Sequence, residues 1–281
     1  MFDRFSRSWS LLKASASVLK QDKELMVFPL VSTIAALIVI GSFAAPLFAF
    51  GWIDQVEEGT APVLAYGWLF LFYLVQYFVI FFFNTALVGA AMIRLRGGDP
   101  TVADGFRIAF GRLGPILGYA VIAATVGMIL RIAEQRLGVV GKWIAGLFGA
   151  AWTVASFLVV PVLVVENVGP IEAVKKSVEL LKKTWGENII GNVGVGLAFF
   201  LMYLLLGVAA AGGIALAVGM KNPTLVFTVI GLAIGCFVVL ALVHAALSGI
   251  YAAALYRYAA EGDAGGAFEA NALGQAFGPK K

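Results

Sequence analysis

Six uninterrupted apolar stretches, each long enough to cross a bilayer, constrain this chain more than any other feature of its sequence. A helix rises about 1.5 Å per residue, so roughly 17–25 residues cross a hydrocarbon core of about 30 Å. The stretches cover residues 26–51, 65–93, 114–131, 143–165, 189–219 and 225–256. Pro29, Pro46 and Pro161 lie inside them and are expected to kink a span. We therefore expect an all-α fold, a polytopic membrane helix bundle with six transmembrane helices.

The composition excludes the main classes of soluble protein. Of the 281 residues, 61% are apolar and 13% are charged, whereas a soluble domain is nearer half apolar and a quarter charged. So few charges cannot coat a water-soluble globule of this size, which excludes a soluble enzyme, a disordered chain and a nucleic-acid-binding domain. The net charge of +4 does not point to nucleic acid, because the lysines and arginines lie in short segments between the apolar stretches.

The distribution of basic residues predicts the orientation in the membrane. If the six stretches are spans, sixteen of the twenty Lys and Arg residues fall on the side of the two termini and four on the opposite side. Loops rich in Lys and Arg stay in the cytoplasm. We therefore expect a multi-pass protein of the cell (plasma or inner) membrane with both termini cytoplasmic, and the inverted topology is the alternative. The first stretch is too long for a cleavable signal, so we expect it to remain as a span.

The order of the segments indicates a threefold internal repeat. Each pair of apolar stretches follows a shorter segment whose apolar residues recur at steps of three and four, which is typical of a helix with one apolar face. We expect a single transmembrane domain over residues 1–260, followed by a flexible cytoplasmic tail at 261–281. The expected repeats cover about 1–96, 97–167 and 168–260.

Two of the short segments can be aligned with each other. Pro100 and Pro170 each stand where a helix is expected to start, and proline suits the first helical turn. Placing Pro100 on Pro170 also places Ala103 on Ala173. The same placement puts Phe110 on Leu180, but these matches are few, and the order of the segments is the stronger indication of a repeat.

The short segments also carry basic and aromatic residues. A helix lying flat at the bilayer surface dips its apolar face among acyl chains while its Lys and Arg side chains meet anionic headgroups, and tryptophan favours the same level. The candidate contacts to lipid or to a partner protein are Arg4, Arg7, Trp9, Arg107, Arg112, Lys175, Lys176, Lys182, Lys183 and Trp185. The alternative is that these segments are elbows packed against the bundle, which set the tilt and orientation of the spans.

Several short runs resemble known membrane proteins. Phe-Asn-Thr-Ala-Leu at 83–87, Gly-Gly-Asp-Pro-Thr at 97–101 and Trp-Gly-Glu at 185–187 resemble a poorly characterised prokaryotic family of six-helix integral membrane proteins. More distantly, the segment 165–177 resembles the membrane domain attached to some bacterial glycerophosphodiester phosphodiesterases, a domain that is not their catalytic part. The resemblance implies a multi-pass membrane protein of unassigned function, and it supplies no active-site residues.

Three polar side chains lie deep within the predicted spans. Asn84, His244 and Ser248 fall near the middle of the second and sixth stretches, where polar groups are costly and often functional. They form the candidate intramembrane polar site or permeation path, and the alternative is a set of hydrogen bonds between helices. Glu166 and Arg94 each end a span at the cytoplasmic edge. We expect a structural ion pair between these two residues, and a functional acid at Glu166 is the alternative.

The sequence offers no recognisable catalytic motif. It contains no HExxH, GxSxG, Walker or CxxC pattern, and a single histidine cannot build the usual zinc site. We therefore expect a non-enzymatic membrane module, with no cofactor or metal, that organises lipids or a partner at the cytoplasmic surface. The expected partners are membrane lipids, and either another membrane protein or a second copy of the chain, but not nucleic acid. The alternative function is a channel or transporter for a small or lipid-like solute.

Overall fold

The computed structural model describes residues 2–52, 55, 62–136, 138–185 and 194–262, and the regular elements within these ranges are all helical. The described part of the chain contains six helical segments that are long and apolar enough to cross a membrane. They are Lys23–Ala49, Val63–Leu95, Leu113–Glu134, Val139–Val165, Ala198–Gly219 and Pro223–Glu261. The prediction of an all-helical chain with six such stretches is therefore confirmed. The start predicted for the fifth stretch, 189–193, lies outside the described residues.

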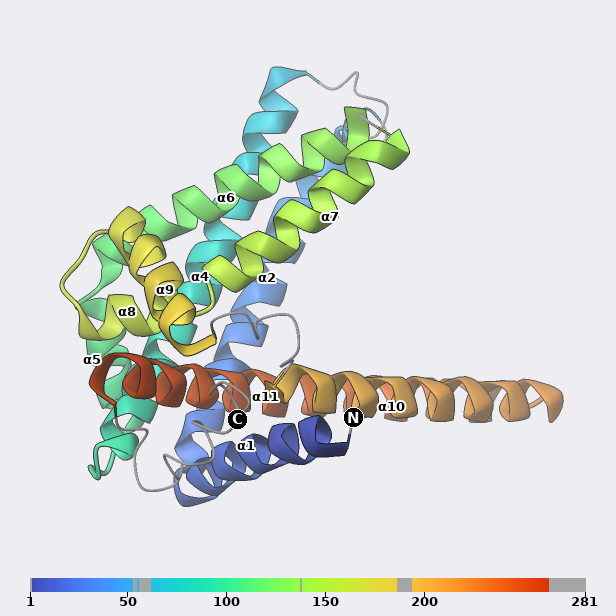
Figure 1. Ribbon diagram of the computed structural model, residues 1–281. Coiled ribbons are helices and arrows are strands. Elements are labelled where there is room, and N and C mark those ends of the chain that lie inside the picture. Colours follow the sequence, from blue (N-terminus) through green and yellow to red (C-terminus); the bar gives the residue numbers. More distant parts are fainter. Residues whose placement is uncertain (1, 53–54, 56–61, 137, 186–193, 263–281) are drawn as a thin grey trace.

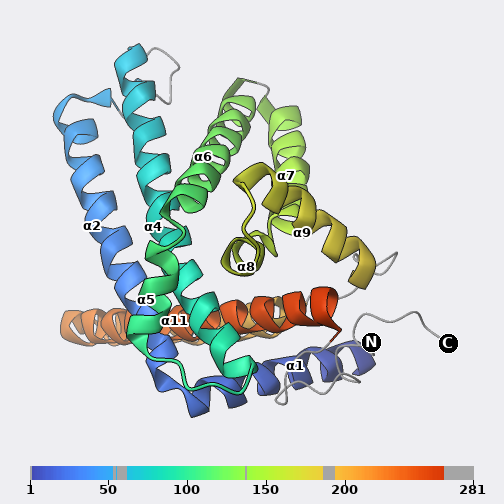
Figure 2. The ribbon, with the colours of Figure 1, turned by 90° about the vertical axis from the view of Figure 1, so that its left-hand side faces the viewer.

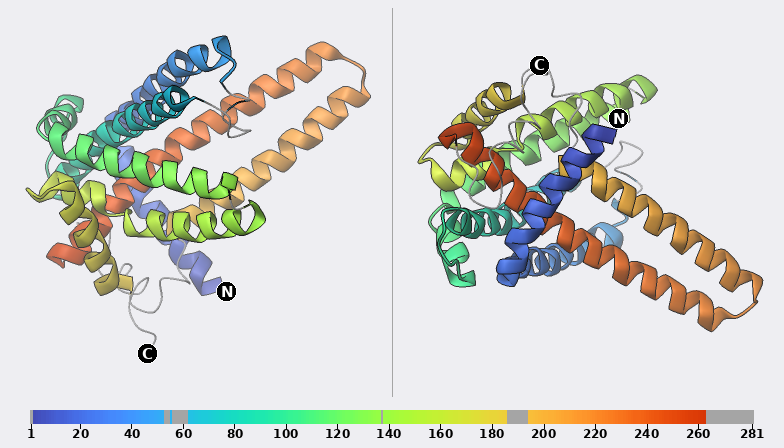
Figure 3. Two further views of the ribbon diagram at one scale, coloured as in Figure 1. Left: turned by 90° about the horizontal axis from the view of Figure 1, so that it is seen from above. Right: turned by 60° about the horizontal axis from the view of Figure 1, so that its bottom comes forward.

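The long helices pair along the chain into antiparallel hairpins. We call them the first hairpin (α2 and α4), the second hairpin (α6 and α7) and the third hairpin (α10 and α11). The helix bounds are α2, Val27–Ala49; α4, Val63–Leu95; α6, Leu113–Arg136; α7, Gly138–Ala155; α10, Gly194–Gly219; and α11, Pro223–Glu261. The third hairpin runs across the direction of the other two (Figures 1 and 2), while all the hairpin tips lie toward one side in the view from above (Figure 3). The hairpins thus diverge from a common end.

We call that common end the base, and define it by Asp22, Arg94, Glu166 and Arg257 with their bonding partners. Helix α4 lies at its centre, because it packs against α2, α5, α6, α8 and α11. Its last three turns are buried almost without interruption from Thr85 to Met92. This segment is rich in alanine and glycine, and small residues let helix backbones approach closely where lipid offers no hydrophobic drive for association.

Four further α-helices of the described chain complete the base, together with a 3-10 helix at Lys23–Met26. Their bounds are α1, Phe2–Gln21; α5, Val102–Phe110; α8, Val159–Val165; and α9, Pro170–Trp185. α1 packs against α10 and α11 of the third hairpin, α5 packs against α4 of the first, and α9 packs chiefly against α8, which continues the second. Each helix that precedes a hairpin therefore contacts the preceding hairpin in cyclic order.

The predicted register between the second and third short segments does not fit the burial. Ala103 is exposed on α5, whereas Ala173, its predicted counterpart, is fully buried on α9. The buried positions of α5 are Gly105 and Ala109, and a shift of two residues would align them with Ala173 and Ser177. Pro170 is the first residue of α9, as predicted, whereas Pro100 lies outside α5, which begins at Val102 after the N-cap Thr101. The face that each helix buries is set by the hairpin against which it packs.

The fourth span is broken near its base end. Helix α7 ends at Ala155 and α8 starts at Val159, so Pro161 stands in the first turn of the second piece. A proline ring clashes with the carbonyl four residues earlier, here that of Phe157, which explains why the helix cannot continue through this point. The prediction of a kink is confirmed at Pro161, whereas Pro29 and Pro46 lie within an uninterrupted α2.

The closest approach between α5 and the first hairpin predicts a sensitive glycine. A Cβ added at Gly105 would lie 2.8 Å from the carbonyl oxygen of Ala86 and would overlap the ring of Phe28. We expect Gly105→Ala to lower the free energy of unfolding by about 1–3 kcal/mol, as overpacking does. The thermal unfolding midpoint in mild detergent measures the effect. The control is Gly231→Ala on α11, whose added Cβ meets nothing within 4 Å, and equal midpoints for the two variants would contradict this packing.

Candidate functional site

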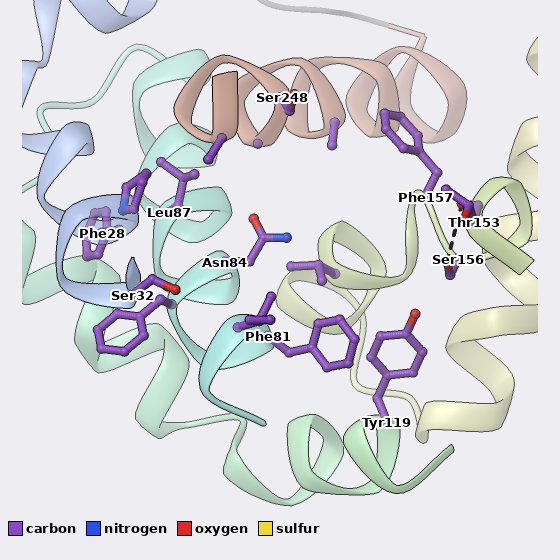
Figure 4. Close-up of a pocket in the computed structure, with 17 residues that line it drawn as sticks. Phe28, Ser32, Phe81, Asn84, Leu87, Tyr119, Thr153, Ser156, Phe157 and Ser248 are labelled. Carbon is purple, nitrogen blue, oxygen red and sulfur yellow. Dashed lines mark hydrogen bonds between the residues drawn. The ribbon is translucent and has the colours of Figure 1, made fainter. Parts of the chain in front are cut away.

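A cavity of about 380 Å³ lies where the hairpins converge, and side chains from α2, α4, α6, α7, α8 and α11 line it. Figure 4 shows α4 at its centre and α11 along one side. Most of the wall is apolar, with aromatic rings from Phe28, Phe81, Phe83 and Phe157. The polar lining residues are Ser32, Asn84, Tyr119, Thr153, Ser156 and Ser248. No charged residue lines it within the part of the chain that the structure describes.

Asn84 occupies the middle of this cavity, with its side-chain amide directed into the open space (Figure 4). Thr153 and Ser156 satisfy their hydroxyls locally, because Thr153 donates to the carbonyl of Gly149 at 2.9 Å and Ser156 to that of Thr153 at 3.3 Å. Among the described residues, none forms a hydrogen bond with the side chain of Asn84 or Ser248. The cavity therefore holds polar groups with unused capacity to donate and accept hydrogen bonds.

The third residue of the predicted polar site lies elsewhere. The ring of His244 stacks on Phe199 of α10, with centroids 4.2 Å apart, and its Nδ1 is 3.5 Å from the hydroxyl of Tyr203. The structure thus brings Asn84 and Ser248 together and places His244 at the α10–α11 contact. Residues four apart on a helix differ by about 40° in direction, and this difference turns His244 toward α10 while Ser248 faces α4.

The base is held by polar contacts that differ from the predicted pair of Arg94 with Glu166. Arg94 forms ion pairs with Asp22, which follows α1, and with Asp99. Glu166 instead accepts a hydrogen bond from the hydroxyl of Tyr256 at 3.0 Å. Two separate contacts therefore replace the expected pair. Asp22 lies close to Arg94, and Tyr256 of α11 lies close to Glu166.

The end of α11 makes a second polar contact with α4. The guanidinium of Arg257 is buried, donates to the carbonyl of Leu95, and pairs with Glu261 at 3.1 Å. Arg96 pairs with the same Glu261 carboxylate at 2.7 Å. Sequence analysis missed the roles of Asp22 and Glu261. The available signal was that both are acidic residues at the cytoplasmic ends predicted for spans, with Lys20 and Lys23 beside Asp22 and Arg257 one turn before Glu261.

A comparison of sequences now identifies the family. Residues 63–266 match a family described as a "Family of unknown function (DUF6159)". The chain belongs to this family. The match runs from the first residue of α4 through α11, so it includes both Asn84 and Ser248, while α1 and α2 precede it. A search of curated proteins found no match.

The family result bears on the two resemblances in different ways. It supports the likeness to an uncharacterised family with membrane-like helices. It gives no support to a link with the glycerophosphodiester phosphodiesterases, so that likeness still depends on the segment 165–177 alone.

The predicted interfacial residues of this DUF6159 member fall into two groups. On α9, Lys175, Lys182 and Lys183 are exposed, and Lys176 and Lys183 each lie 3.7 Å from the carboxylate of Glu179. The opposite side of α9 is buried, including Ala173. The lysines of α9 therefore form an outward-facing group, which we call the α9 lysine face.

The arginines near α5 are engaged with protein instead. Arg107 is exposed but lies 3.1 Å from Asp104. The Thr101 hydroxyl and backbone N–H donate to Asp104 and, with Arg107, hold its pKa below the usual range. Arg112 donates to the side-chain oxygen of Asn167 at 2.8 Å, which ties the start of α6 to the segment after α8. The side chains of the remaining candidates, Arg4, Arg7, Trp9 and Trp185, lie outside the described residues.

One buried hydrogen bond joins α9 to the cavity wall. The hydroxyl of Ser177, which is fully buried, accepts a bond of 3.1 Å from the backbone N–H of Leu158 in the broken fourth span. The residues just before Leu158, Ser156 and Phe157, line the cavity. Ser177 thus satisfies a donor that the helix break leaves free.

This bond predicts a stability effect. We expect Ser177→Ala to lower the free energy of unfolding by about 1–3 kcal/mol, because the Leu158 N–H is left buried without an acceptor. The matched control is Ser17→Ala in α1, whose hydroxyl donates to the carbonyl of Ala14 in its own helix at 2.7 Å. The unfolding midpoint in detergent compares the two variants. A Ser177→Ala midpoint no lower than that of the control would contradict the capping role.

Proposed function

We propose that this protein is a non-enzymatic integral membrane protein that gathers anionic lipids against the α9 lysine face. The observation that carries the proposal is the position of α9, which buries one side against the protein and keeps Lys175, Lys182 and Lys183 exposed. Ile171, one turn before Lys175, has 63% of its surface exposed. An apolar side chain and basic side chains exposed on one helix suit the boundary between acyl chains and headgroups.

The strength expected of this face follows from simple electrostatics. A basic residue near an anionic bilayer surface contributes about 1 kcal/mol of attraction. Exposed ion pairs such as those with Glu179 are worth little, so they leave most of the lysine charge available to lipid. Within the described chain, neither Lys175 nor Lys182 pairs with a carboxylate. These two residues are therefore the strongest candidates for headgroup contacts.

The proposal extends to the placement of the protein. We infer that the base lies at the cytoplasmic surface of the cell membrane, with both termini on that side, since loops rich in Lys and Arg are retained there. The divergence of the hairpins from one base (Figure 3) supports this placement. The cyclic packing of α1, α5 and α9 supports a threefold repeat, although α5 and α9 do not bury the positions that their prolines align.

The proposal that the protein is not an enzyme rests on the residue types at its cavity. The described lining carries an amide and hydroxyls, with neither a carboxylate nor an imidazole among them. A hydroxyl needs an adjacent base to become a nucleophile. The alternative function, a channel or transporter for a small or lipid-like solute, draws on the same cavity, because every hairpin contributes to its wall.

The α9 lysine face gives a direct test. We expect the double variant Lys175→Glu/Lys182→Glu to lose at least about tenfold of its preference for anionic over zwitterionic lipid, since two contributions of about 1 kcal/mol become repulsions. Mass spectrometry of the lipids retained after purification in mild detergent measures that preference.

The control places the same charge change at the other end of the molecule. Lys142→Glu/Lys221→Glu alters α7 and the turn before α11, near the hairpin tips, and should leave the preference unchanged. Raising the salt concentration to 1 M should weaken the preference of the unmodified protein, because the screening length falls to about 3 Å. An equal loss in both double variants, or none in either, would refute the proposal.

A further inference from the structure

The central cavity presents two polar side chains, Asn84 and Ser248, that form no hydrogen bond with the residues that the structure describes. Asn84 comes from the first hairpin and Ser248 from the third, and both face the same space (Figure 4). The two helices approach closely beside them, because a Cβ at Gly249 would lie 2.5 Å from the side chain of Leu87 and 3.5 Å from the side-chain oxygen of Asn84. The amide and the hydroxyl thus line one cavity from two helices in close contact.

The side chains of Asn84 and Ser248 need hydrogen-bond partners in a cavity whose wall is mostly apolar. A polar group surrounded by apolar side chains is strongly destabilising unless it forms hydrogen bonds, and hydrocarbon supplies none. The hydroxyls of Thr153 and Ser156, by contrast, donate hydrogen bonds to the backbone carbonyls of Gly149 and Thr153. The unused capacity of Asn84 and Ser248 therefore points to an occupant of the cavity.

The lining defines the chemistry of that occupant. An amide and a hydroxyl each donate and accept, so together they match a head that carries a hydroxyl donor beside a carbonyl acceptor. With no charged residue in the described lining, an ionised headgroup would be desolvated without compensation. The aromatic wall suits an apolar body, and the volume of about 380 Å³ lies within the usual range of ligand sites.

The route of entry is lateral. Ile80 on α4 and Ala245 on α11 both line the cavity and are exposed. The cavity therefore opens to the surface at these two helices, both of which are long and apolar enough to cross a membrane.

We propose that this cavity binds the hydroxyl and ester head of a neutral glycerolipid, a mono- or diacylglycerol, that enters from the bilayer between α4 and α11. Asn84 and Ser248 bond the head, and the acyl chains extend past Ile80 into lipid. The site is separate from the α9 lysine face, so it goes beyond the function proposed above and can fail independently of it.

The experiment uses the full chain in mild detergent and dioctanoylglycerol as the probe, with the bound fraction measured by native mass spectrometry. We expect saturable binding of one molecule. Ala245→Phe should abolish binding by filling the cavity from an exposed position, Asn84→Leu should weaken it at least tenfold, and Ser248→Ala should weaken it about threefold. The matched control, Ser42→Ala, removes an exposed hydroxyl of α2 that donates to the carbonyl of Ile38 and should bind as the unmodified protein does.

Two further binding measurements test the chemistry and the location of the site, one with a charged lipid and one with the α9 double variant. Dioctanoyl phosphatidic acid, which has the same chains and a charged head, should bind at least tenfold more weakly. The Lys175→Glu/Lys182→Glu variant should bind dioctanoylglycerol normally, which separates this site from the α9 lysine face. No binding to the unmodified protein, binding that survives both Ala245→Phe and Ser248→Ala, or equal binding of phosphatidic acid would each overturn the proposal. Should Asn84→Leu fail to fold, the other two cavity variants still decide the outcome.

Discussion

The close packing at the base end of α4 is the constraint on which the rest of the structure depends. In lipid, helices gain little from the hydrophobic effect when they associate, so close backbone approach and hydrogen bonds must hold them together. Helix α4 supplies both, because its segment from Thr85 to Met92 is buried and its end carries Arg94 and Leu95, followed by Arg96. Arg94 pairs with Asp22 after α1, while the carbonyl of Leu95 and the guanidinium of Arg96 bond Arg257 and Glu261 at the end of α11.

Because the polar contacts of α11 with α4 lie at the base, the third hairpin is free to diverge beyond it, whereas α4 and α6 stay joined farther out, where Arg131 donates to the hydroxyl of Tyr73 at 3.0 Å. The outer half of the third hairpin is largely exposed (Figure 1), with apolar side chains such as Leu205 and Phe227 turned outward. This is the surface expected of helices that meet acyl chains. The divergence also explains the cavity, since helices fixed at the base and separating above it cannot fill the space between them.

The spans could be predicted from the sequence, whereas the partners at the base could not. Hydropathy over some twenty residues is a local property, so the six apolar helices of the described chain can be predicted from it. Proline chemistry indicates three possible breaks, and only the one before Pro161 occurs, because Pro29 and Pro46 lie in an uninterrupted α2. Arg94 pairs with Asp22 and not with Glu166 because of how distant segments pack against each other. No local sequence pattern predicts that packing. The separation of His244 from Ser248 has the same origin, because both faces of α11 are apolar and only the neighbouring helices distinguish them.

Helix α9 connects the two regions to which we assign roles. Its exposed side carries Lys175 and Lys182, and its buried side carries Ser177, which bonds the backbone of Leu158. That bond holds the segment whose neighbours, Ser156 and Phe157, form part of the cavity wall. A displacement of α9 relative to α8 would break the bond and free this wall segment.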